Sequence, residues 1–183
     1  MGLDAVLLHD EFGDRHVWDA AVARGLGDRR RVVAIDFDRD AGSGGRGFEA
    51  WTEEALAAID RCAGGRAALV GTGTGGIVAT AAAARRPDLV ESVVLVAPRL
   101  GAVETALLAP VECPVAIVHG ERGRAISSLA IESLEAILGR AVAVTVVTGA
   151  ADDLLRTRPA ATAGAIAGAL TAAAWAGPVG SPA

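Results

Sequence analysis

The stretch LVGTGTGGIVATAAA, residues 69–83, decides the fold. Its first residues are apolar, as in a buried strand, and its last are small residues typical of a helix. Between them, residues 71–76 consist only of glycine and threonine, a composition that predicts a tight turn. The turn contains neither serine nor cysteine. The stretch therefore predicts a strand, a sharp turn and a helix, and raises the question of what such a turn does without a nucleophile.

Apolar runs of strand length recur along the chain on both sides of this turn. They lie at residues 5–9, 31–37, 67–71, 92–98, 115–120 and 141–147. The runs are almost continuously apolar, as strands covered on both faces must be. Because segments with helical spacing alternate with them, we expect a parallel sheet between two layers of helices. The predicted fold is α/β: a three-layer α/β/α sandwich around a mostly parallel, six-stranded sheet.

The spacing of apolar residues also places helix faces. One predicted face comprises Ala55, Leu56, Ile59 and Cys62, and another comprises Ile126, Leu129, Leu134 and Ile137. The last helix, roughly 158–174, carries Gly164 and Gly168 four residues apart. Small residues allow a close approach of backbones. We expect this face to pack on the sheet; a seam between two copies of the chain is the alternative.

Composition limits the classes of function. The chain has 183 residues and a formal net charge of −5, which predicts one domain (1–175) with a flexible tail (176–183) and no nucleic-acid partner. All of its basic residues are arginine, and this bias, with the excess of alanine and glycine, points to a GC-rich bacterial genome. Two cysteines are too few for a disulfide scaffold.

Targeting signals are the next feature. The N-terminal stretch MGLDAVLLHD has no basic region and turns polar early, so it does not read as a signal peptide. Residues 160–176 are mostly Ala, Gly and Thr, too weakly hydrophobic for a membrane span. We therefore expect a cytoplasmic protein that does not bind membranes.

The turn at 71–76 resembles the nucleophile elbow of the α/β-hydrolase superfamily. Other stretches look like further parts of that family, in the right order. They are VLLHDEFGDRHVWDAAVARGL (first core strand, oxyanion loop and helix), VVAIDFDRDAGSG (next strand and glycine-rich loop), CPVAIVHGERG (acid strand) and VVTGAADDLLRTRP (histidine loop). The resemblance covers nearly the whole chain. It implies the hydrolase core without a cap domain, since only residues 99–113 stand where a cap is normally inserted.

The resemblance also shows departures at each catalytic position. Matched motif to motif, the nucleophile falls on Gly73, the acid on Gly123 and the histidine on Asp152. The oxyanion loop, usually His-Gly, reads His9-Asp10-Glu11. Serine hydrolysis needs a nucleophile, a base and an orienting carboxylate. We therefore do not expect a standard esterase, lipase or thioesterase mechanism, and we expect the carboxylates beside the oxyanion hole, formed by the N–H groups of Thr74 and Glu11, to weaken it.

Candidate functional residues are the polar ones at the carboxyl ends of the strands, where open α/β sheets bind ligands. Catalytic roles are predicted for Asp152, His9 and Asp10. Ligand-binding roles are predicted for Glu11, Thr72, Gly73, Thr74, Arg99, Glu121, Arg122 and Asp153. We expect no metal and no cofactor.

Structural roles are the alternative for the same residues. A histidine that ends a strand, such as His9 or His119, often pins a loop by hydrogen bonds. Thr72 and Thr74 can satisfy the backbone of the turn. Asp152 and Asp153 suit the start of a helix, where carboxylates complement the helix dipole. This structural role is the favoured one for the two aspartates.

Three functions remain open. The first is non-hydrolytic binding of a small organic ligand, or acid–base catalysis on it of the isomerase, lyase or cyclase type. The second is a pseudo-hydrolase that acts as a scaffold for a protein partner. The third is nucleotide binding, because Gly71-x-Gly73-x-x-Gly76 also fits the dinucleotide fingerprint; that fingerprint belongs on the first strand of its fold, however, and here it follows the third.

Overall fold

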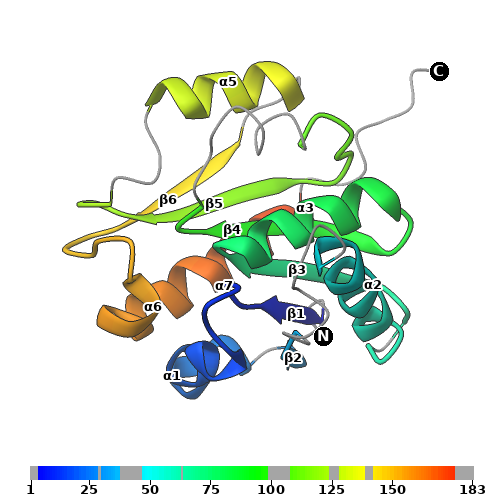
Figure 1. The fold of residues 1–183 in the computed structure, drawn as a ribbon. Helices are drawn as coiled ribbons and strands as arrows, with labels where there is room; N and C mark the ends of the chain where they lie inside the picture. Colours follow the sequence, from blue (N-terminus) through cyan, green and yellow to red (C-terminus); the bar gives the residue numbers. More distant parts are fainter. Residues whose placement is uncertain are drawn as a thin grey trace.

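A parallel sheet is the centre of the fold, with the strand order β2-β1-β3-β4-β5-β6 in the described part of the chain (Figure 1). The structure is a computed structural model that describes residues 4–28, 30–37, 47–62, 64–98, 108–123, 128–138 and 142–175. Every strand pairs in parallel with its neighbours. The strands are β1 (Ala5–Leu8), β2 (Val32–Ile35), β3 (Ala67–Thr72), β4 (Val90–Val96), β5 (Val115–Gly120) and β6 (Ala143–Val147).

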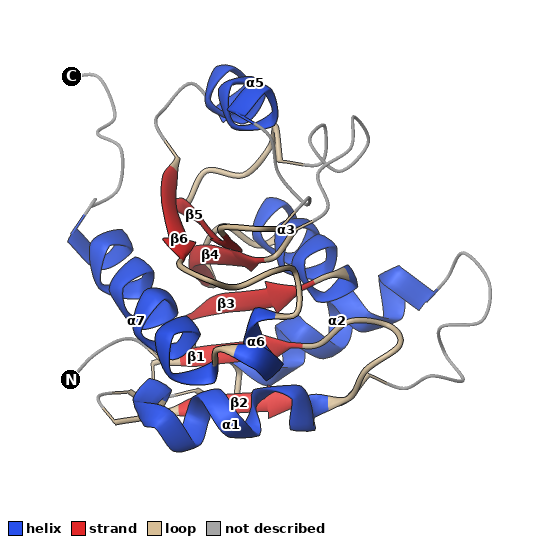
Figure 2. Ribbon diagram, turned by 90° about the vertical axis from the view of Figure 1, so that its left-hand side faces the viewer, coloured by secondary structure: helices blue, strands red, loops and turns tan. Residues whose placement is uncertain are grey.

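Helices cover both faces of the sheet, and Figure 2 shows α2 and α3 on the side opposite α7. The helices are α1 (Asp19–Ala21), α2 (Gly47–Ile59), α3 (Thr74–Arg85), α5 (Ser128–Leu138), α6 (Leu154–Thr157) and α7 (Pro159–Trp175). A 3₁₀ turn, η1 (Arg15–Trp18), precedes α1, and a π-type turn, η2 (Val22–Leu26), follows it. The predicted three-layer α/β/α sandwich is confirmed.

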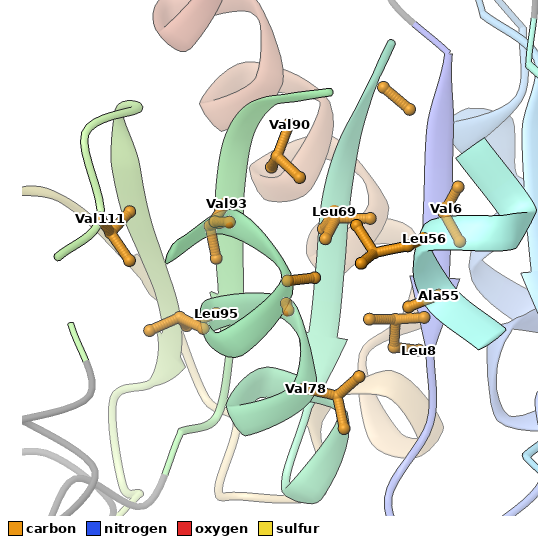
Figure 3. Close-up of a cluster of buried hydrophobic side chains, with 14 of the residues drawn as sticks. Val6, Leu8, Ala55, Leu56, Leu69, Val78, Val90, Val93, Leu95 and Val111 are labelled. Carbon is orange, nitrogen blue, oxygen red and sulfur yellow. The ribbon is translucent and has the colours of Figure 1, made fainter. Parts of the chain in front are cut away.

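Two hydrophobic clusters separate according to the alternation of side chains along the strands. Val6 and Leu8 of β1 point to the cluster built with α2 and α3, which Figure 3 shows in close-up. Ala5 and Leu7 point to the other cluster, which contains residues of α6 and α7. The central strands are therefore buried on both faces, as their continuous apolar runs predict.

The edge strands depart from that pattern. Three of the four residues of β2 are only partly buried, and Val146 of β6 is 50% exposed. The helices therefore cover the faces of these two edge strands less completely than those of the central strands. Continuous apolarity alone does not distinguish an edge strand from a central one.

Two predictions about helix faces need correction. Helix α2 ends at Ile59, and Cys62 lies in the turn that follows, although its side chain is buried as predicted. In α5, Leu134 is buried, but Leu129 is 72% exposed and Ile137 is also exposed. On α5, Leu134 is buried in the core cluster and Leu138, one turn further along, packs against it.

The glycines of α7 also differ from expectation. Gly164 and Gly168 are exposed, and a Cβ on either would meet no atom within 4 Å. The predicted close packing of this face on the sheet is therefore wrong. The opposite face of α7, including Ala163, Ile166 and Leu170, carries the contact with the sheet. Every helix in the described segments falls short of the length or apolarity that a bilayer-spanning helix requires.

The connection between β4 and β5 decides whether a cap is present. It spans residues 97–114, which is too short for an inserted domain. The core therefore has no cap, as the sequence predicts. Residues 99–107 within this connection, Arg99 among them, and the predicted tail at 176–183 lie outside the described residues.

Candidate functional site

The turn between β3 and α3 holds Gly73 at φ 53° and ψ −124°, a backbone conformation that residues with a side chain adopt only under strain. Such a sharp strand-to-helix turn is where an α/β-hydrolase presents its nucleophile. Neighbouring backbone crowds the turn, because a Cβ on Gly75 would overlap the carbonyl oxygen of Leu8. The backbone therefore adopts the geometry of the elbow, with glycine at its apex.

The carboxylate of Asp10 lies directly over this apex. A Cβ placed on Gly73 would overlap both the Cγ and the Oδ2 atom of Asp10. Oδ1 of Asp10 accepts hydrogen bonds from the backbone N–H groups of Glu11 (2.7 Å) and Thr74 (3.3 Å). These are the N–H of the residue after the apex and one from the loop after β1, the two positions that form an oxyanion hole. Both N–H groups of the predicted hole therefore have the Asp10 side chain as their acceptor.

His9 lies beneath the same loop, at 1% exposure. Its Nε2 atom accepts a hydrogen bond from the Phe37 N–H (3.1 Å), which leaves Nδ1 as the donor to the carbonyl oxygen of Asp10 (2.6 Å). Its ring also packs against the Phe37 ring, with 4.9 Å between the two ring centroids. Nε2 thus joins the end of β1 to the end of β2, and Nδ1 holds the loop that follows β1, which is the structural role considered for this histidine. Its catalytic role stays a prediction.

Asp36, at the end of β2, holds the segment that follows the oxyanion loop. Its Oδ1 atom accepts a hydrogen bond from the Arg15 N–H (2.7 Å), and its Oδ2 atom lies 3.4 Å from Arg15 Nε. The loop after β1 is therefore tied to β2 at both ends, by His9 near its start and by Arg15 where η1 begins.

A second group of candidate residues gathers at the ends of β5 and β6. The predicted matching of motifs puts Gly123 at the position of the family's catalytic acid and Asp152 at that of its histidine. A Cβ on Gly123 would come within 2.5 Å of Asp152 Oδ1, so the Asp152 side chain occupies that space. The arrangement repeats the one at Gly73: a carboxylate from another loop lies against a glycine in place of a side chain. This placement does not test the catalytic role of Asp152, which stays a prediction.

Glu121 and Arg122 tie these two loops together. Glu121 Oε2 accepts a hydrogen bond from the Gly149 N–H (2.9 Å), and Arg122 Nη2 donates to the Gly149 carbonyl oxygen (2.5 Å). The Arg122 N–H donates to the Ala150 carbonyl oxygen (2.9 Å). Both side chains, predicted to bind a ligand, make structural contacts in this state.

Asp153 directly precedes the short helix α6. It makes no side-chain bond to the helix N–H groups, but its Oδ2 atom pairs with Arg156 Nη2 at 2.6 Å. Thr72 and Thr74 lie at the turn as predicted, and the Thr74 side chain is buried. Strand β4 separates the group around Asp10 from the group around Asp152.

Ala97 is a feature that the motifs of the sequence did not single out. It follows β4 with φ 46°, the one positive φ outside glycine in the described chain. Its N–H donates to the Val118 carbonyl oxygen at 2.8 Å, which holds this conformation in place. Positive φ in a residue with a side chain concentrates at functional sites, and Ala97 lies at the same edge of the sheet as the two groups above.

Metal binding finds no support in the described residues, where no cluster of three or more His, Cys, Asp or Glu side chains is placed to hold an ion. Residues 124–127, which follow Gly123 and include Arg124, lie outside the described chain.

Comparison with solved structures places the fold. The chain superposes on a predicted CIB-like hydrolase from Thermoplasma acidophilum with a TM-score of 0.74 and 16% identity, over 91% of this chain and 84% of that one. It superposes on NosK from Streptomyces actuosus with a TM-score of 0.75 and 22% identity, over 95% of this chain and 100% of that one. For the thioesterase domain from the curacin biosynthetic pathway, the TM-score is 0.75 at 12% identity, over 93% of this chain and 91% of that one. At these identities the likeness concerns the fold alone.

Comparison by sequence gives the family. No curated protein matches the chain. The model of the family described as "Alpha/beta hydrolase family" matches residues 5–182, nearly the whole chain. The elbow at Gly73, the sheet order and this match agree, and the chain belongs to the alpha/beta hydrolase family.

Proposed function

We propose that this chain uses the hydrolase fold to bind a small organic molecule and to act on it by acid–base chemistry instead of serine-type hydrolysis. The observation that supports this proposal is the Asp10 carboxylate, which accepts both N–H groups of the oxyanion hole. A hydrolase needs those two donors for the oxyanion of its tetrahedral intermediate. Here they already have an acceptor.

The residues at the matched catalytic positions support the same conclusion. Gly73 offers no atom that attacks a carbonyl carbon, and Gly123 has no carboxylate to orient a base. Asp152 stands where the histidine would relay the proton. Acyl transfer by the usual mechanism needs all three functions together, so hydrolysis by this site is not expected.

The remaining chemistry belongs to Asp10 itself. Its Oδ1 atom is fixed by two N–H groups, while its Oδ2 atom lies in the space that a side chain at position 73 would fill. A carboxylate fixed through one oxygen presents the other as a hydrogen-bond acceptor in a defined direction. Such a group can accept a proton from a bound ligand and return it to another atom, as isomerisation, elimination or cyclisation requires.

A labelling experiment tests the absence of hydrolysis. The wild-type protein is incubated with a fluorophosphonate probe for active serines and with a panel of short acyl nitrophenyl esters. We expect neither labelling nor turnover above the rate of free ester hydrolysis. Labelling of the wild-type protein would show that a nucleophile lies elsewhere in the chain and would contradict the proposal.

Ligand binding is tested separately, by thermal denaturation in the presence of small organic molecules that carry hydroxyl or amino groups. We expect a subset to raise the melting temperature of the wild-type protein, because a ligand that binds only the folded state stabilises it. The matched control is Asp10→Asn, which preserves shape but removes the charge and the proton acceptor. Ligands that stabilise both proteins equally do not bind through the Asp10 carboxylate.

A partner-binding scaffold is the second candidate, favoured by Phe12. This side chain is 88% exposed and lies two residues after Asp10 in the oxyanion loop. Aromatic side chains are enriched in protein–protein interfaces relative to the rest of the surface. If a partner protein covers this loop, Phe12→Ser weakens that complex while small-ligand binding at Asp10 remains; the two functions are therefore separable.

Nucleotide binding receives no support from the turn that motivated it. In dinucleotide-binding folds, the N–H groups at the helix N-terminus bind the pyrophosphate. Here the Thr74 N–H donates to Asp10, and the carboxylate would repel a phosphate at that position.

A further inference from the structure

We infer that Asp10 determines the specificity of this site: its carboxylate occupies an otherwise complete anion site and excludes carboxylates and other oxyanions from it. The inference rests on the proposed function, since it concerns the class of ligand that the same site accepts. It adds a latent property, namely that the chain binds small carboxylates at the elbow once the Asp10 side chain is removed.

The donors of this anion site are already in place. The N–H groups of Glu11 and Thr74 converge on one oxygen atom at 2.7 and 3.3 Å. Thr74 is the first residue of α3, a helix of 12 residues, so the positive end of its dipole adds to the attraction. The positive φ of Gly73 directs the Thr74 N–H toward this point. A negatively charged group, the Asp10 carboxylate, lies at the site, which shows that the geometry accommodates an anion.

The Asp10 side chain and a bound anion exclude each other. The overlap between the Asp10 carboxylate and a Cβ built on Gly73 shows that the carboxylate lies above the apex of the elbow. Removing the carboxylate leaves there a volume of similar size, because Gly73 contributes no side chain. An added anion finds both N–H donors already bound to Asp10, and the negative charge of Asp10 also repels it.

The loop does not depend on the Asp10 carboxylate for its position. The carbonyl oxygen of Asp10 accepts hydrogen bonds from His9 Nδ1 (2.6 Å) and from the Gly13 N–H (2.9 Å). The His9 ring is held in turn by the Phe37 N–H. These backbone contacts remain when the side chain at position 10 is shortened. The Glu11 N–H should therefore keep its place and lose only its acceptor.

The test is a formate titration followed by the backbone amide signals of Glu11 and Thr74 in ¹⁵N-correlated NMR spectra. In Asp10→Ala, we expect saturable shifts of these two signals, with an affinity for formate at least about tenfold above that of the wild-type protein, equivalent to about 1.4 kcal/mol. The matched control is Asp10→Asn. Its amide oxygen still accepts from both N–H groups, so we expect it to resemble the wild type although its charge is gone.

Each other outcome overturns the inference. Formate binding by the wild-type protein at similar affinity would show that Asp10 does not close the site. Binding by Asp10→Asn as tight as by Asp10→Ala would show that charge excludes anions and occupancy does not. A folded Asp10→Ala protein that fails to bind formate would show that the two N–H groups do not form an anion site.

Folding and the proposed function are checked independently. If Asp10→Ala does not give a native spectrum, Asp10→Gly takes its place, because glycine is the residue that usually follows the histidine in this loop of the family. Failure of the proposed function appears as fluorophosphonate labelling of the wild-type protein, which leaves the formate result unaffected. Failure of the inference appears only in the titration.

Discussion

At the scale of single residues, positions 10 and 73 are coupled. Gly73 has no side chain where the elbow of a hydrolase presents one, and the Asp10 carboxylate fills that space. A Cβ at position 73 therefore requires the Asp10 carboxylate to move from its present place. The effects of substitutions at the two positions on the free energy of unfolding should therefore depend on each other.

We expect Gly73→Ala to lower the free energy of unfolding by about 1–3 kcal/mol, because a Cβ at φ 53° is strained and overlaps Asp10. In the double variant Gly73→Ala/Asp10→Gly, the overlap disappears and the strain at φ remains, so part of the loss should be recovered. Urea denaturation of the wild type, both single variants and the double variant measures the coupling. Strict additivity, within about 0.5 kcal/mol, would mean that Asp10 does not occupy this space.

The residue scale is also where prediction from the sequence ended. The motif predicted Gly73 at the apex of the turn and the N–H groups of Thr74 and Glu11 as an oxyanion hole; in the structure Gly73 lies at that apex, and both N–H groups donate to one oxygen of Asp10. It predicted that nearby carboxylates weaken the hole, but not that Asp10 accepts both donors. That contact depends on the side-chain torsions of one residue. A signal existed in the motif matching, which predicts an acid where the family usually has glycine in the loop and a glycine where it has the nucleophile.

At the scale of elements, α7 shows how a pattern of small residues can mislead. Gly164 and Gly168 share a face, and the sequence favoured contact with the sheet for it. In the structure the sheet contacts larger residues such as Ile166 and Leu170, and the glycines face away. Helix α5 gives a similar lesson: apolar residues occur all round it, so the spacing did not identify which of them, in the event Leu134, is buried.

We expect Gly164→Ala and Gly168→Ala each to raise the free energy of unfolding by about 0.5–1 kcal/mol, the difference in helix propensity, because the added Cβ meets no atom within 4 Å. The matched control is Gly76→Ala in α3, where the Cβ would lie 3.3 Å from Leu95 Cδ2 in the core, so that crowding reduces the gain. Urea denaturation measures all three. A concentration-dependent loss of stability in the α7 variants would instead reveal a second copy of the chain packed on this face.

At the scale of the whole molecule, the continuous apolar runs and their alternation with helices predicted the parallel sheet and its layers. The family resemblance supplied the order of the elements. The strand order β2-β1-β3-β4-β5-β6 required the structure, because many pairings are compatible with the same runs. The core on one face of this sheet joins α2, α3 and the central strands in a single cluster, so we expect it to unfold as one unit.

The reactivity of the Cys62 thiol shows whether this cluster is folded. The Cys62 side chain is 6% exposed within the cluster, and burial raises the pKa of the thiol, so little reactive thiolate is present in the folded state. In a Cys113→Ser background, where Cys62 is the single thiol, we expect alkylation by iodoacetamide to be slow without urea. Its rate should then rise with urea in parallel with the loss of helical circular dichroism, because the thiol becomes accessible only when the cluster opens.

The slope of the alkylation free energy against urea distinguishes the two possible forms of opening. Global unfolding exposes the surface of the whole domain and gives the same slope as equilibrium denaturation, whereas local fraying of the turn after α2 exposes little surface and gives a slope near zero. Cys62 follows the end of α2 by only three residues and donates to the Ala58 carbonyl oxygen at 3.7 Å, so fraying is the competing possibility. Fast labelling that does not depend on urea would show that this turn opens independently of the sheet.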